Sequence, residues 1–321
     1  MGGGSLPILV GPTAVGKTAV ALALAVHLPL EVISADSRQI YRRLDIGTAK
    51  PSRRELLRVT HHGVDVIEPG ERYSAGRFAR EASGWVEEVR RRGRLPVVVG
   101  GTGLYIRALA DGLFVEPPLD VERRRALEHW ISGLAAPELV RWAGRLDPGF
   151  AGGGRQRASR AIEIALLTGH PLTAWHDRAR GEGAVTPWYV RLTAPRPVLR
   201  QRIRVRAEGM VRRGLVEEVA SVLSDGHPPD APGLDAVGIR EAVEYLHGER
   251  SRESVAEAIA AATRAYAKRQ ETWFRHQLRG PVLTLDATRP TEELAAEIAA
   301  AWQGGRPLFS EAAPMTDSRS P

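Results

Sequence analysis

The amino-acid sequence predicts an α/β protein, with a P-loop-type parallel sheet, flanking helices and a small all-helical insertion domain. First, the apolar run of residues 6–10 leads directly into a glycine-rich loop, which a helix-forming run follows. Second, further apolar segments alternate with amphipathic ones, which is typical of a doubly wound parallel sheet. Third, residues 117–186 contain charged helical stretches and glycine-rich turns without a convincing strand. We therefore expect a core of residues 1–116 and 187–303, an insertion of residues 117–186 and a disordered tail of residues 304–321.

The glycine-rich loop fits the pattern G-x-x-x-x-G-K-[ST], in the strand–loop–helix context that this pattern requires. It consists of Gly11, Pro12, Thr13, Ala14, Val15, Gly16, Lys17 and Thr18. Glycines allow backbone N–H groups to turn inward around a phosphate, and the N-terminus of the following helix adds partial positive charge. Lys17 can bring its ammonium group to the outer phosphates, and the Thr18 hydroxyl can hold Mg²⁺. The loop therefore predicts a diphosphate or triphosphate ligand.

The first part of the core is predicted to contain three more strands. We expect them at residues 31–35, 63–67 and 95–99, with a long helix between the last two. Ser74 is a suitable N-cap for this helix, and its apolar residues recur at helical spacing up to a basic end at Gly93. The strand at residues 95–99 is continuously apolar, as in a buried parallel sheet, and opens into Gly-Gly-Thr-Gly-Leu-Tyr at residues 100–105.

The insertion and the rest of the core are predicted from the same patterns. Helices are expected at residues 120–132, 137–146 and 156–167, then at 196–213, 254–277 and 291–302, with strands at 188–193 and 281–286. The helix at residues 196–213 carries seven arginines against one acid, Glu208. Such one-sided charge near a phosphate site favours contact with an anion over a simple solvated face.

Composition narrows the class of partner. The chain has 321 residues, a formal net charge of +7 and a pI of about 10.2, which favours a polyanionic partner. Its basic residues are almost all arginine, yet a lysine, Lys17, stands in the phosphate loop, where ammonium and guanidinium groups are not interchangeable. The lack of cysteine excludes disulfides, thiol nucleophiles and cysteine-type zinc sites. With no membrane-spanning run and no signal peptide in the sequence, we expect a cytoplasmic protein without membrane association.

Asp36 is the strand-end acid closest to the loop in the predicted topology, because it directly follows the strand at residues 31–35. It is a candidate Mg²⁺ ligand or general base, and the alternative is a turn or helix-cap residue. The strand at residues 95–99 ends in Gly-Gly-Thr and so lacks the acid of a Walker B strand. His61 and His62 have no third ligand at useful spacing, and we interpret them as the polar start of a strand and not as a metal site.

Five segments that occur in order give a more specific signal. They are residues 11–18, Ser34-Ala-Asp-Ser-Arg-Gln-Ile-Tyr41, Asp45-Ile-Gly-Thr-Ala-Lys-Pro51, Gly100-Gly-Thr-Gly-Leu-Tyr105 and Lys268-Arg-Gln-Glu-Thr-Trp273. Together they resemble the tRNA dimethylallyltransferase (tRNA isopentenyltransferase) family over about residues 6–280. No cysteine–histidine zinc finger follows the last domain, which indicates the bacterial form.

The resemblance implies that the loop holds the diphosphate of dimethylallyl diphosphate and not ATP. The dimethylallyl group would pass to N6 of the adenosine at tRNA position 37, immediately 3′ of the anticodon, with release of diphosphate. In the family an arginine of the helix after the insertion neutralises the leaving group; Arg206 matches it, and Arg202, one turn earlier, is the alternative. Asp36 matches the family's base, and Thr102 matches the threonine that orients the target adenine. The implied cofactor is Mg²⁺, and the implied partners are dimethylallyl diphosphate and tRNA, bound through its anticodon stem-loop.

An adenine stacked in an anticodon loop must be flipped out to reach such a site. The residues that the resemblance assigns to RNA contact are Asp36, Ser37, Arg38, Gln39, Thr102, Arg124, Gln156, Arg157, Ala158, Ser159, Arg160, Ala236, Val237, Gly238, Ile239, Arg240, Glu241, Lys268, Arg269, Gln270 and Arg275. Arg157 and Arg160, three residues apart on one helix face, can straddle backbone phosphates. Ile239 departs from the family, where an aromatic residue is expected, and we interpret Trp273 and Phe274 as core residues.

Three other functions are weighed against this one. A prenyltransferase that makes cytokinin from free AMP, ADP or ATP needs no large basic surface, so the arginine-rich helices argue against it. A small-molecule P-loop kinase could use Asp36 to deprotonate a hydroxyl group. An RNA-binding ATPase would form no covalent product. Nothing in the pattern requires more than one copy of the chain.

Overall fold

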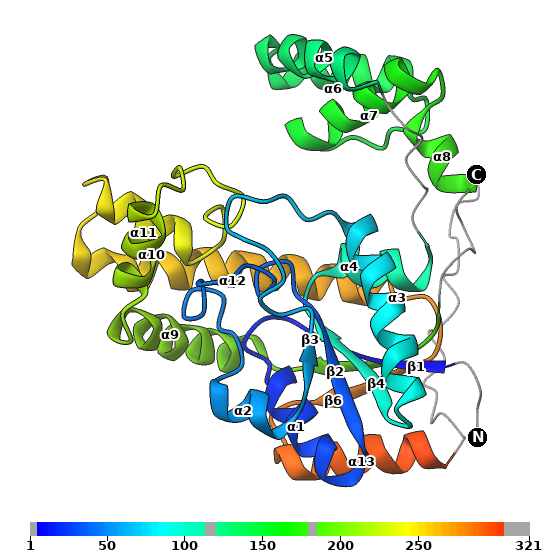
Figure 1. The fold of residues 1–321 in the computed structure, drawn as a ribbon, viewed down its shortest axis with the longest axis vertical. Coiled ribbons are helices and arrows are strands. Elements are labelled where there is room, and N and C mark those ends of the chain that lie inside the picture. The colour runs from blue at the N-terminus through cyan, green and yellow to red at the C-terminus, as the bar shows by residue number, and fades with distance from the viewer. Residues whose placement is uncertain (1–4, 113–119, 179–184, 305–321) are drawn as a thin grey trace, which may run out of the picture. The chain divides into compact units, whose positions relative to one another are not determined.

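The computed structural model describes residues 5–112, 120–178 and 185–304, and the chain divides into two compact units. The first unit consists of Met1–Ala110 with Val185–Pro321, and the second of Asp111–Ala184 (Figure 1). The second unit covers nearly the same span as the expected insertion of residues 117–186. From residue 305 on, the expected tail lies outside the described residues.

A six-stranded parallel sheet forms the centre of the first unit, in the order β3-β2-β4-β1-β5-β6, and confirms the predicted α/β class. The strands are β1 (Ser5–Val10), β2 (Leu30–Ala35), β3 (His61–His62), β4 (Leu95–Gly100), β5 (Thr186–Thr193) and β6 (Val282–Asp286). Gly100 of β4 pairs with Val10 of β1 on one side and with Ala35 of β2 on the other. Because the strands are parallel, the loops that follow β1, β2 and β4 emerge side by side at one edge of the sheet.

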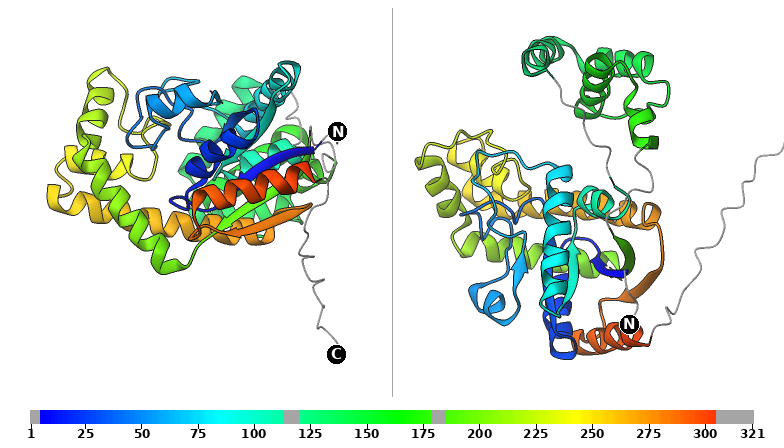
Figure 2. Two further views of the ribbon diagram at one scale, coloured as in Figure 1. Left: turned by 90° about the horizontal axis from the view of Figure 1, so that it is seen from below. Right: turned by 45° about the vertical axis from the view of Figure 1, so that its right-hand side comes forward.

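Helices cover both faces of the sheet (Figures 1 and 2). Those of the first unit are α1 (Lys17–His27), α2 (Arg53–Arg58), α3 (Ala75–Arg91), α4 (Gly103–Ala110), α9 (Arg196–Arg212), α10 (Leu215–Ser224), α11 (Ile239–Leu246), α12 (Arg252–His276) and α13 (Thr291–Gln303). Leu9 and Val97 belong to an apolar cluster with α1 and α13. Their neighbours Ile8 and Val98 are equally buried, and strand alternation turns them to the opposite face, where α3 contacts β2 and β4.

The boundaries of α3 follow from its sequence. The backbone N–H of Arg77 donates to the Ser74 hydroxyl at 3.1 Å, so Ser74 is the predicted N-cap. At the other end Gly93 has a φ of +70°, a left-handed value that glycine adopts readily after a helix. Inside the fold, Phe78 of α3 stacks on Tyr105 of α4 with ring centroids 4.5 Å apart, which fixes the position of α4 next to the sheet edge.

The third strand lies earlier in the chain than predicted. β3 is His61–His62, whereas in the segment of residues 63–67 only Ile67 forms an isolated bridge. Gly63 and Asp65 have φ values of +76° and +54°, and these left-handed conformations break an extended strand. The predicted strand at residues 63–67 is therefore wrong. The histidine pair does form a strand, and Nε2 of His62 lies 2.8 Å from the carboxylate of Glu31.

A second apolar cluster joins α9, α10, α11 and α12 to the segment that follows β2. Ile203, Leu215, Ile239 and Ile259, one from each helix, are almost fully buried in it together with Leu44. α10 and α11 were not anticipated from the sequence, because glycine- and proline-rich turns interrupt their apolar pattern. Among the described residues, no helix is long and apolar enough to cross a membrane.

The second unit is entirely helical where it is described. It contains α5 (Val121–Gly133), α6 (Ala136–Leu146), α7 (Arg155–Thr168) and α8 (Leu172–Arg178). Asp120 caps α5 by accepting hydrogen bonds from the N–H groups of Glu122 and Arg123 at 3.0 and 2.9 Å. Leu139, Ala143 and Ile162 lie in its small core, so the unit has an apolar centre of its own.

Candidate active site

The phosphate loop has the backbone conformation that its glycines predict. Gly11 and Gly16 have φ values of +152° and +109°, and Ala14 is also left-handed at +63°. A Cβ atom on Gly11 would lie 2.7 Å from the carbonyl oxygen of Leu192, so no other residue fits between β1 and β5 at this point. Gly16 is the N-cap of α1, and Thr18 follows in the first turn of that helix. The loop therefore curls over the N-terminus of α1, as an anion-binding loop does.

Lys17 is held inside the curl of the loop. Its ammonium group donates to the carbonyl oxygens of Gly11 and Pro12 at 2.8 and 2.9 Å. Burial lowers the pKa of Lys17 to about 8, with the charge of Asp36 opposing this shift and the charge of Arg206 adding to it. Three charged side chains from β2, α1 and α9 thus act on one another around the loop.

Asp36 and Thr102 lie at the ends of neighbouring strands and are connected. The Oγ1 of Thr102 accepts a hydrogen bond from the N–H of Ser37 at 2.9 Å, and the N–H of Thr102 donates to the carbonyl oxygen of Ala35 at 3.1 Å. Oδ1 of Asp36 accepts from the N–H groups of Arg38 and Gln39 at 2.9 and 3.4 Å. Asp36 therefore does form the turn that the alternative interpretation expected, and this turn uses one carboxylate oxygen and fixes the side chain.

The Gly-Gly-Thr-Gly turn after β4 consists of close approaches that exclude side chains. A Cβ on Gly100 would lie 2.1 Å from the carbonyl oxygen of Ala35, and one on Gly103 would lie 2.5 Å from the Trp273 ring. A Cβ on Gly101 would lie 2.3 Å from Nε2 of Gln270. The glycines thus let β4, β2 and α12 approach one another closely, and this holds Thr102 beside the turn of Asp36.

Gln270 connects the two halves of the site. Its Oε1 accepts from the N–H of Thr13 at 2.8 Å, and its Nε2 donates to the carbonyl oxygen of Gly101 at 2.8 Å. The side chain is buried, and both ends of its amide are occupied by backbone groups. The sequence assigns Gln270 to RNA contact; in the structure it holds the phosphate loop against the turn that carries Thr102.

Tyr266 is a site residue that the sequence analysis missed. It precedes Gln270 by one turn of α12, and its hydroxyl lies close to Thr102 and Gln270. Burial and the nearby charge of Asp36 raise its pKa, which keeps the hydroxyl protonated. The i, i+4 spacing from Gln270 was the signal that could have identified it.

The structure separates the two arginines between which the sequence left a choice. The guanidinium of Arg202 donates to the carbonyl oxygens of Val15 and Ala287 at 3.0 and 2.9 Å, so it braces the back of the phosphate loop. Arg206 instead faces the charges of the site: burial lowers its pKa, and the charge of Asp36 opposes that shift. The charges of Asp36 and Lys17 thus act on Arg206, whereas the Arg202 guanidinium is held by backbone carbonyls.

A second part of the site is a pocket lined by Lys17, Thr18, Ser34, Asp36 and Gln39. Its polar side chains supply hydroxyl, amide and carboxylate oxygens, which Mg²⁺ prefers, while Val32, Val99 and Ala21 form an apolar part of the lining. The described residues contain no cluster of three or more histidine, aspartate or glutamate side chains that could hold a metal ion. A divalent ion here would depend on the oxygens of the ligand as well as on Thr18.

The segment predicted to contact RNA after α10 is mostly inside the protein. Ala236, Gly238 and Ile239 are buried, and the buried carboxylate of Glu241 accepts from the N–H of Gly238 at 2.7 Å to cap α11. The side chains of Ala236, Ile239 and Glu241 are thus buried, and the assignment of this segment to RNA contact stays a prediction. Val237 is half-buried, and Arg240 is the exposed cation of this segment.

The remaining predicted contacts differ in exposure. On α12, Lys268, Arg269 and Arg275 are exposed, and Phe274 is buried as predicted. Near the turn after β2, the guanidinium of Arg38 donates to the carbonyl oxygen of Pro232 at 3.1 Å. The side chain of Gln39 donates to the carbonyl oxygen of Ala49 at 3.2 Å and accepts from the Ser34 hydroxyl at 3.0 Å. Arg38 and Gln39 therefore have structural roles in this turn.

In the second unit the predicted contacts lie on α5 and α7. Gln156 and Arg157 are exposed, Ser159 is half-buried and Ala158 is in the core. Arg160 pairs with the carboxylate of Glu163 at 2.8 Å, and Arg124 pairs with the same carboxylate at 2.7 Å. Glu163 thus holds Arg124 and Arg160 next to each other, while Arg157 extends into solvent.

The segment of residues 45–51 contributes to the fold through Glu218, which the sequence analysis also missed. The carboxylate of Glu218 on α10 accepts from the N–H groups of Asp45, Ile46 and Gly47 at 2.7, 2.8 and 2.9 Å. A Cβ on Gly47 would lie 2.6 Å from a side-chain carbon of Ile239. Three consecutive N–H groups around one carboxylate fix this loop on α10 and α11.

Comparison with known proteins identifies the family. A family model described as IPP transferase matches residues 39–277, and one described as Isopentenyl transferase matches residues 4–64. The chain belongs to the IPP transferase family. This confirms the resemblance that the five ordered segments indicated.

This IPP transferase family member has many curated relatives. It is 41% identical over 275 residues to the tRNA dimethylallyltransferase of Geobacter metallireducens, covering 84% of this chain and 89% of the relative. It is 45% identical over 278 residues to the tRNA dimethylallyltransferase of an Azoarcus species, covering 84% and 86% of the two chains. The relatives are thus matched over nearly their whole length.

Solved structures agree with the family. The full-length tRNA isopentenylpyrophosphate transferase of Bacillus halodurans superimposes with a TM-score of 0.70 at 35% identity, covering 94% of this chain and 96% of that one. A eukaryotic dimethylallyltransferase acting on tRNA has a TM-score of 0.78 at 23% identity, with 96% and 81% of the chains covered, and shares the fold.

Proposed function

We propose that this chain is a tRNA dimethylallyltransferase. It transfers the dimethylallyl group of dimethylallyl diphosphate to N6 of the adenosine immediately 3′ of the anticodon and releases diphosphate. The observation that carries the proposal is the hydrogen-bonded pair of strand ends with Asp36 and Thr102, next to a phosphate loop whose Lys17 is buried with that carboxylate nearby. Relatives named tRNA dimethylallyltransferase favour this function over a small-molecule kinase or a cytokinin-forming enzyme.

The donor side of the reaction depends on neutralising the leaving group. An incoming diphosphate takes over the Lys17 ammonium from the carbonyl oxygens of Gly11 and Pro12, and Arg206 adds a second positive charge. As the bond between N6 and the allylic C1 forms, the bond between C1 and the diphosphate oxygen breaks, and its electron pair leaves with the diphosphate. Cations fixed before the reaction stabilise that developing charge at little cost of reorganisation.

The acceptor side depends on Asp36 and Thr102. An exocyclic adenine amine is a poor nucleophile, so a carboxylate that accepts its proton assists the attack. The turn hydrogen bonds to Oδ1 hold the Asp36 carboxylate in one orientation at the end of β2. The Thr102 hydroxyl, fixed by Ser37, orients the base, and the Tyr266 hydroxyl keeps Thr102 in position.

The polar side of the pocket beside Lys17 offers oxygen ligands, and we propose Thr18 as the protein ligand of Mg²⁺, with the diphosphate supplying further oxygens. When bound, such an ion neutralises diphosphate charge and so makes the diphosphate a better leaving group. The protein's own part is to hold the Thr18 hydroxyl in the first turn of α1.

We further propose that exposed and half-buried cations of both units contact the anticodon stem-loop. In the second unit these are Arg157 and the pair Arg124 and Arg160, which Glu163 holds together. In the first unit they are Arg240, Lys268, Arg269 and Arg275. We also propose that the enzyme acts in the cytoplasm as a single copy, which sedimentation of the purified protein would test.

The direct test is a product assay. The purified protein is incubated with dimethylallyl diphosphate, Mg²⁺ and an unmodified tRNA with adenosine 3′ of the anticodon, and the digested nucleosides are weighed by mass spectrometry. A gain of one dimethylallyl group on adenosine is expected. Phosphorylation of a small molecule from ATP, or ATP hydrolysis stimulated by RNA without a modified nucleoside, would contradict the proposal.

A further inference from the structure

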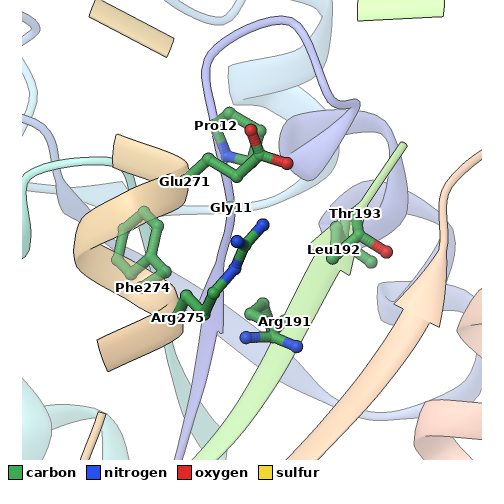
Figure 3. A pocket seen from close by; sticks show the side chains of 8 residues that line it. All are labelled: Gly11, Pro12, Arg191, Leu192, Thr193, Glu271, Phe274 and Arg275. Carbon is green, nitrogen blue, oxygen red and sulfur yellow. The ribbon is translucent and has the colours of Figure 1, made fainter. Parts of the chain in front are cut away.

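Two arginines from distant parts of the chain converge on a pocket at the start of the phosphate loop. Arg191 of β5 and Arg275 near the end of α12 line it, together with Gly11 and Glu271 (Figure 3). The two guanidinium groups point into the space between β5 and α12. The pocket adjoins the phosphate loop at Gly11 and Pro12 but shares none of its lining residues with the pocket around Lys17.

In the part of the chain that the structure describes, Arg191 lacks a partner at a buried atom, and the exposed Arg275 beside it is also unpaired. Nε of Arg191 is buried and has no hydrogen-bond acceptor. Within residues 5–112, 120–178 and 185–304, neither Arg191 nor Arg275 has a hydrogen bond or an ion pair. Buried N–H groups are normally paired, so the unpaired Nε of Arg191 indicates a missing acceptor such as an ion or a ligand.

The charges around the pocket also favour an anion. Burial and the charge of Arg275 both lower the pKa of Arg191, and Glu271 opposes this shift. The lining therefore brings two positive charges together against one negative charge. An anion between the guanidinium groups would relieve their repulsion and supply the acceptor that Nε lacks.

We propose that this pocket binds a phosphate group through the guanidinium groups of Arg191 and Arg275. The planar fork of a guanidinium matches the oxygens of a phosphate, and two forks from different elements can hold one tetrahedral anion. A chain with a net charge of +7 suits phosphate-rich partners. The source is either the RNA backbone or a free phosphate, and the two are separated by experiment. Its first readout requires no prenyl donor and so is independent of the proposed function.

The first arm measures inorganic phosphate binding. Because the phosphate loop also binds anions, Lys17→Ala serves as the parent protein, and phosphate is titrated while the thermal unfolding midpoint is followed. In this parent, Arg191→Gln and Arg275→Gln are expected to raise the Kd for phosphate by about tenfold. Glu271→Gln, which removes the negative charge, is expected to lower it. Arg58→Gln, an exposed arginine on α2, is the matched control and should leave it unchanged.

The second arm measures RNA binding by the protein with an intact phosphate loop. The affinity for an anticodon stem-loop is determined at several salt concentrations, and a backbone contact at this pocket is expected to make the salt slope of Arg191→Gln or Arg275→Gln shallower by about one. A loss in this arm identifies the RNA backbone as the source, and a loss in the phosphate arm alone identifies a free phosphate.

Circular dichroism checks that each variant folds. Arg275→Gln, at an exposed position, tests the site if Arg191→Gln does not fold. Unchanged behaviour in both arms would overturn the proposal.

Discussion

The backbone N–H of Thr13 donates to Oε1 of Gln270, 257 positions later in the chain, at a distance of 2.8 Å. The other end of the same amide donates to the carbonyl oxygen of Gly101 at 2.8 Å. One buried side chain therefore links the diphosphate loop to the turn that carries Thr102. This link fixes the position of the phosphate loop, which holds the donor in the proposed reaction, relative to the turn of Thr102, which holds the acceptor.

Replacement of Gln270 by methionine is expected to let the phosphate loop and the turn of Thr102 move relative to each other. The side chain keeps its approximate volume but leaves the N–H of Thr13 and the carbonyl of Gly101 buried without partners, at a cost of about 1–3 kcal/mol each. We expect steady-state kinetics to show a fall in kcat of about tenfold and a higher KM for dimethylallyl diphosphate. Gln201→Met, on an exposed part of α9, is the matched control. Loss of stability with unchanged kinetics would mean that Gln270 only supports the fold.

Arg202 and Arg206 are expected to differ in what their loss affects. Arg202→Ala removes two hydrogen bonds to backbone carbonyls and should lower the free energy of unfolding by about 2 kcal/mol. Arg206→Ala removes a charge that faces the loop and should weaken donor binding and turnover while the unfolding free energy stays close to that of the parent protein. Urea denaturation and donor titration of both variants make the comparison. The reverse pattern would assign the diphosphate to Arg202.

Donor binding is expected to depend on pH through Lys17. Burial lowers the pKa of its ammonium to about 8 in the free protein, so the charge is present below that pH and is lost above it. The affinity for dimethylallyl diphosphate should therefore be constant below about pH 8 and fall as the pH rises further. Lys17→Arg keeps its charge throughout this range, so it should bind the donor more weakly but without that decline. An affinity of the unsubstituted protein that stays flat well above pH 8 would show that Lys17 does not bind the donor as an ammonium group.

Arg157 is expected to contribute an electrostatic contact with RNA. It is exposed on α7, and its replacement by alanine should weaken tRNA binding and make the salt slope shallower by about one. Arg141→Ala, another exposed arginine of the same unit, is the control. Fluorescence anisotropy over a series of salt concentrations provides the measurement. Equal slopes for the two variants would rule out a specific phosphate contact at Arg157.

The parts of the site that follow from local chemistry could be predicted from the sequence. The glycines of the loop at residues 11–18 allow the positive φ values that a curled phosphate loop needs, and the ends of β2 and β4 meet because parallel strands share an edge. Asp36 and Thr102 were assigned by the family resemblance, each directly after or close to the end of one of these strands. The hydrogen bonds through Ser37 and Ala35 connect the two turns.

The parts that depend on contacts between distant segments could not be predicted. Whether Gln270 contacts RNA or the phosphate loop depends on how α12 packs across the sheet, which its sequence pattern leaves open. The roles of Glu218 and Arg202 likewise depend on backbone groups that lie far away in the chain. The strand predicted at residues 63–67 was wrong because the apolar alternation after Gly63 also fits a turn. Gly63 adopts the positive φ that such a turn needs.

The central claim is that Asp36 removes a proton from the adenine amine while the phosphate loop holds the leaving group. It is tested most directly by the single-turnover rate of dimethylallyl transfer to a saturating, prebound anticodon stem-loop, compared between the unsubstituted protein and Asp36→Asn. We expect the rate to fall by about 10²–10⁴-fold, with the Kd values for RNA and dimethylallyl diphosphate nearly unchanged. An unaltered rate, or a loss of rate matched by an equal loss of binding, would contradict the account.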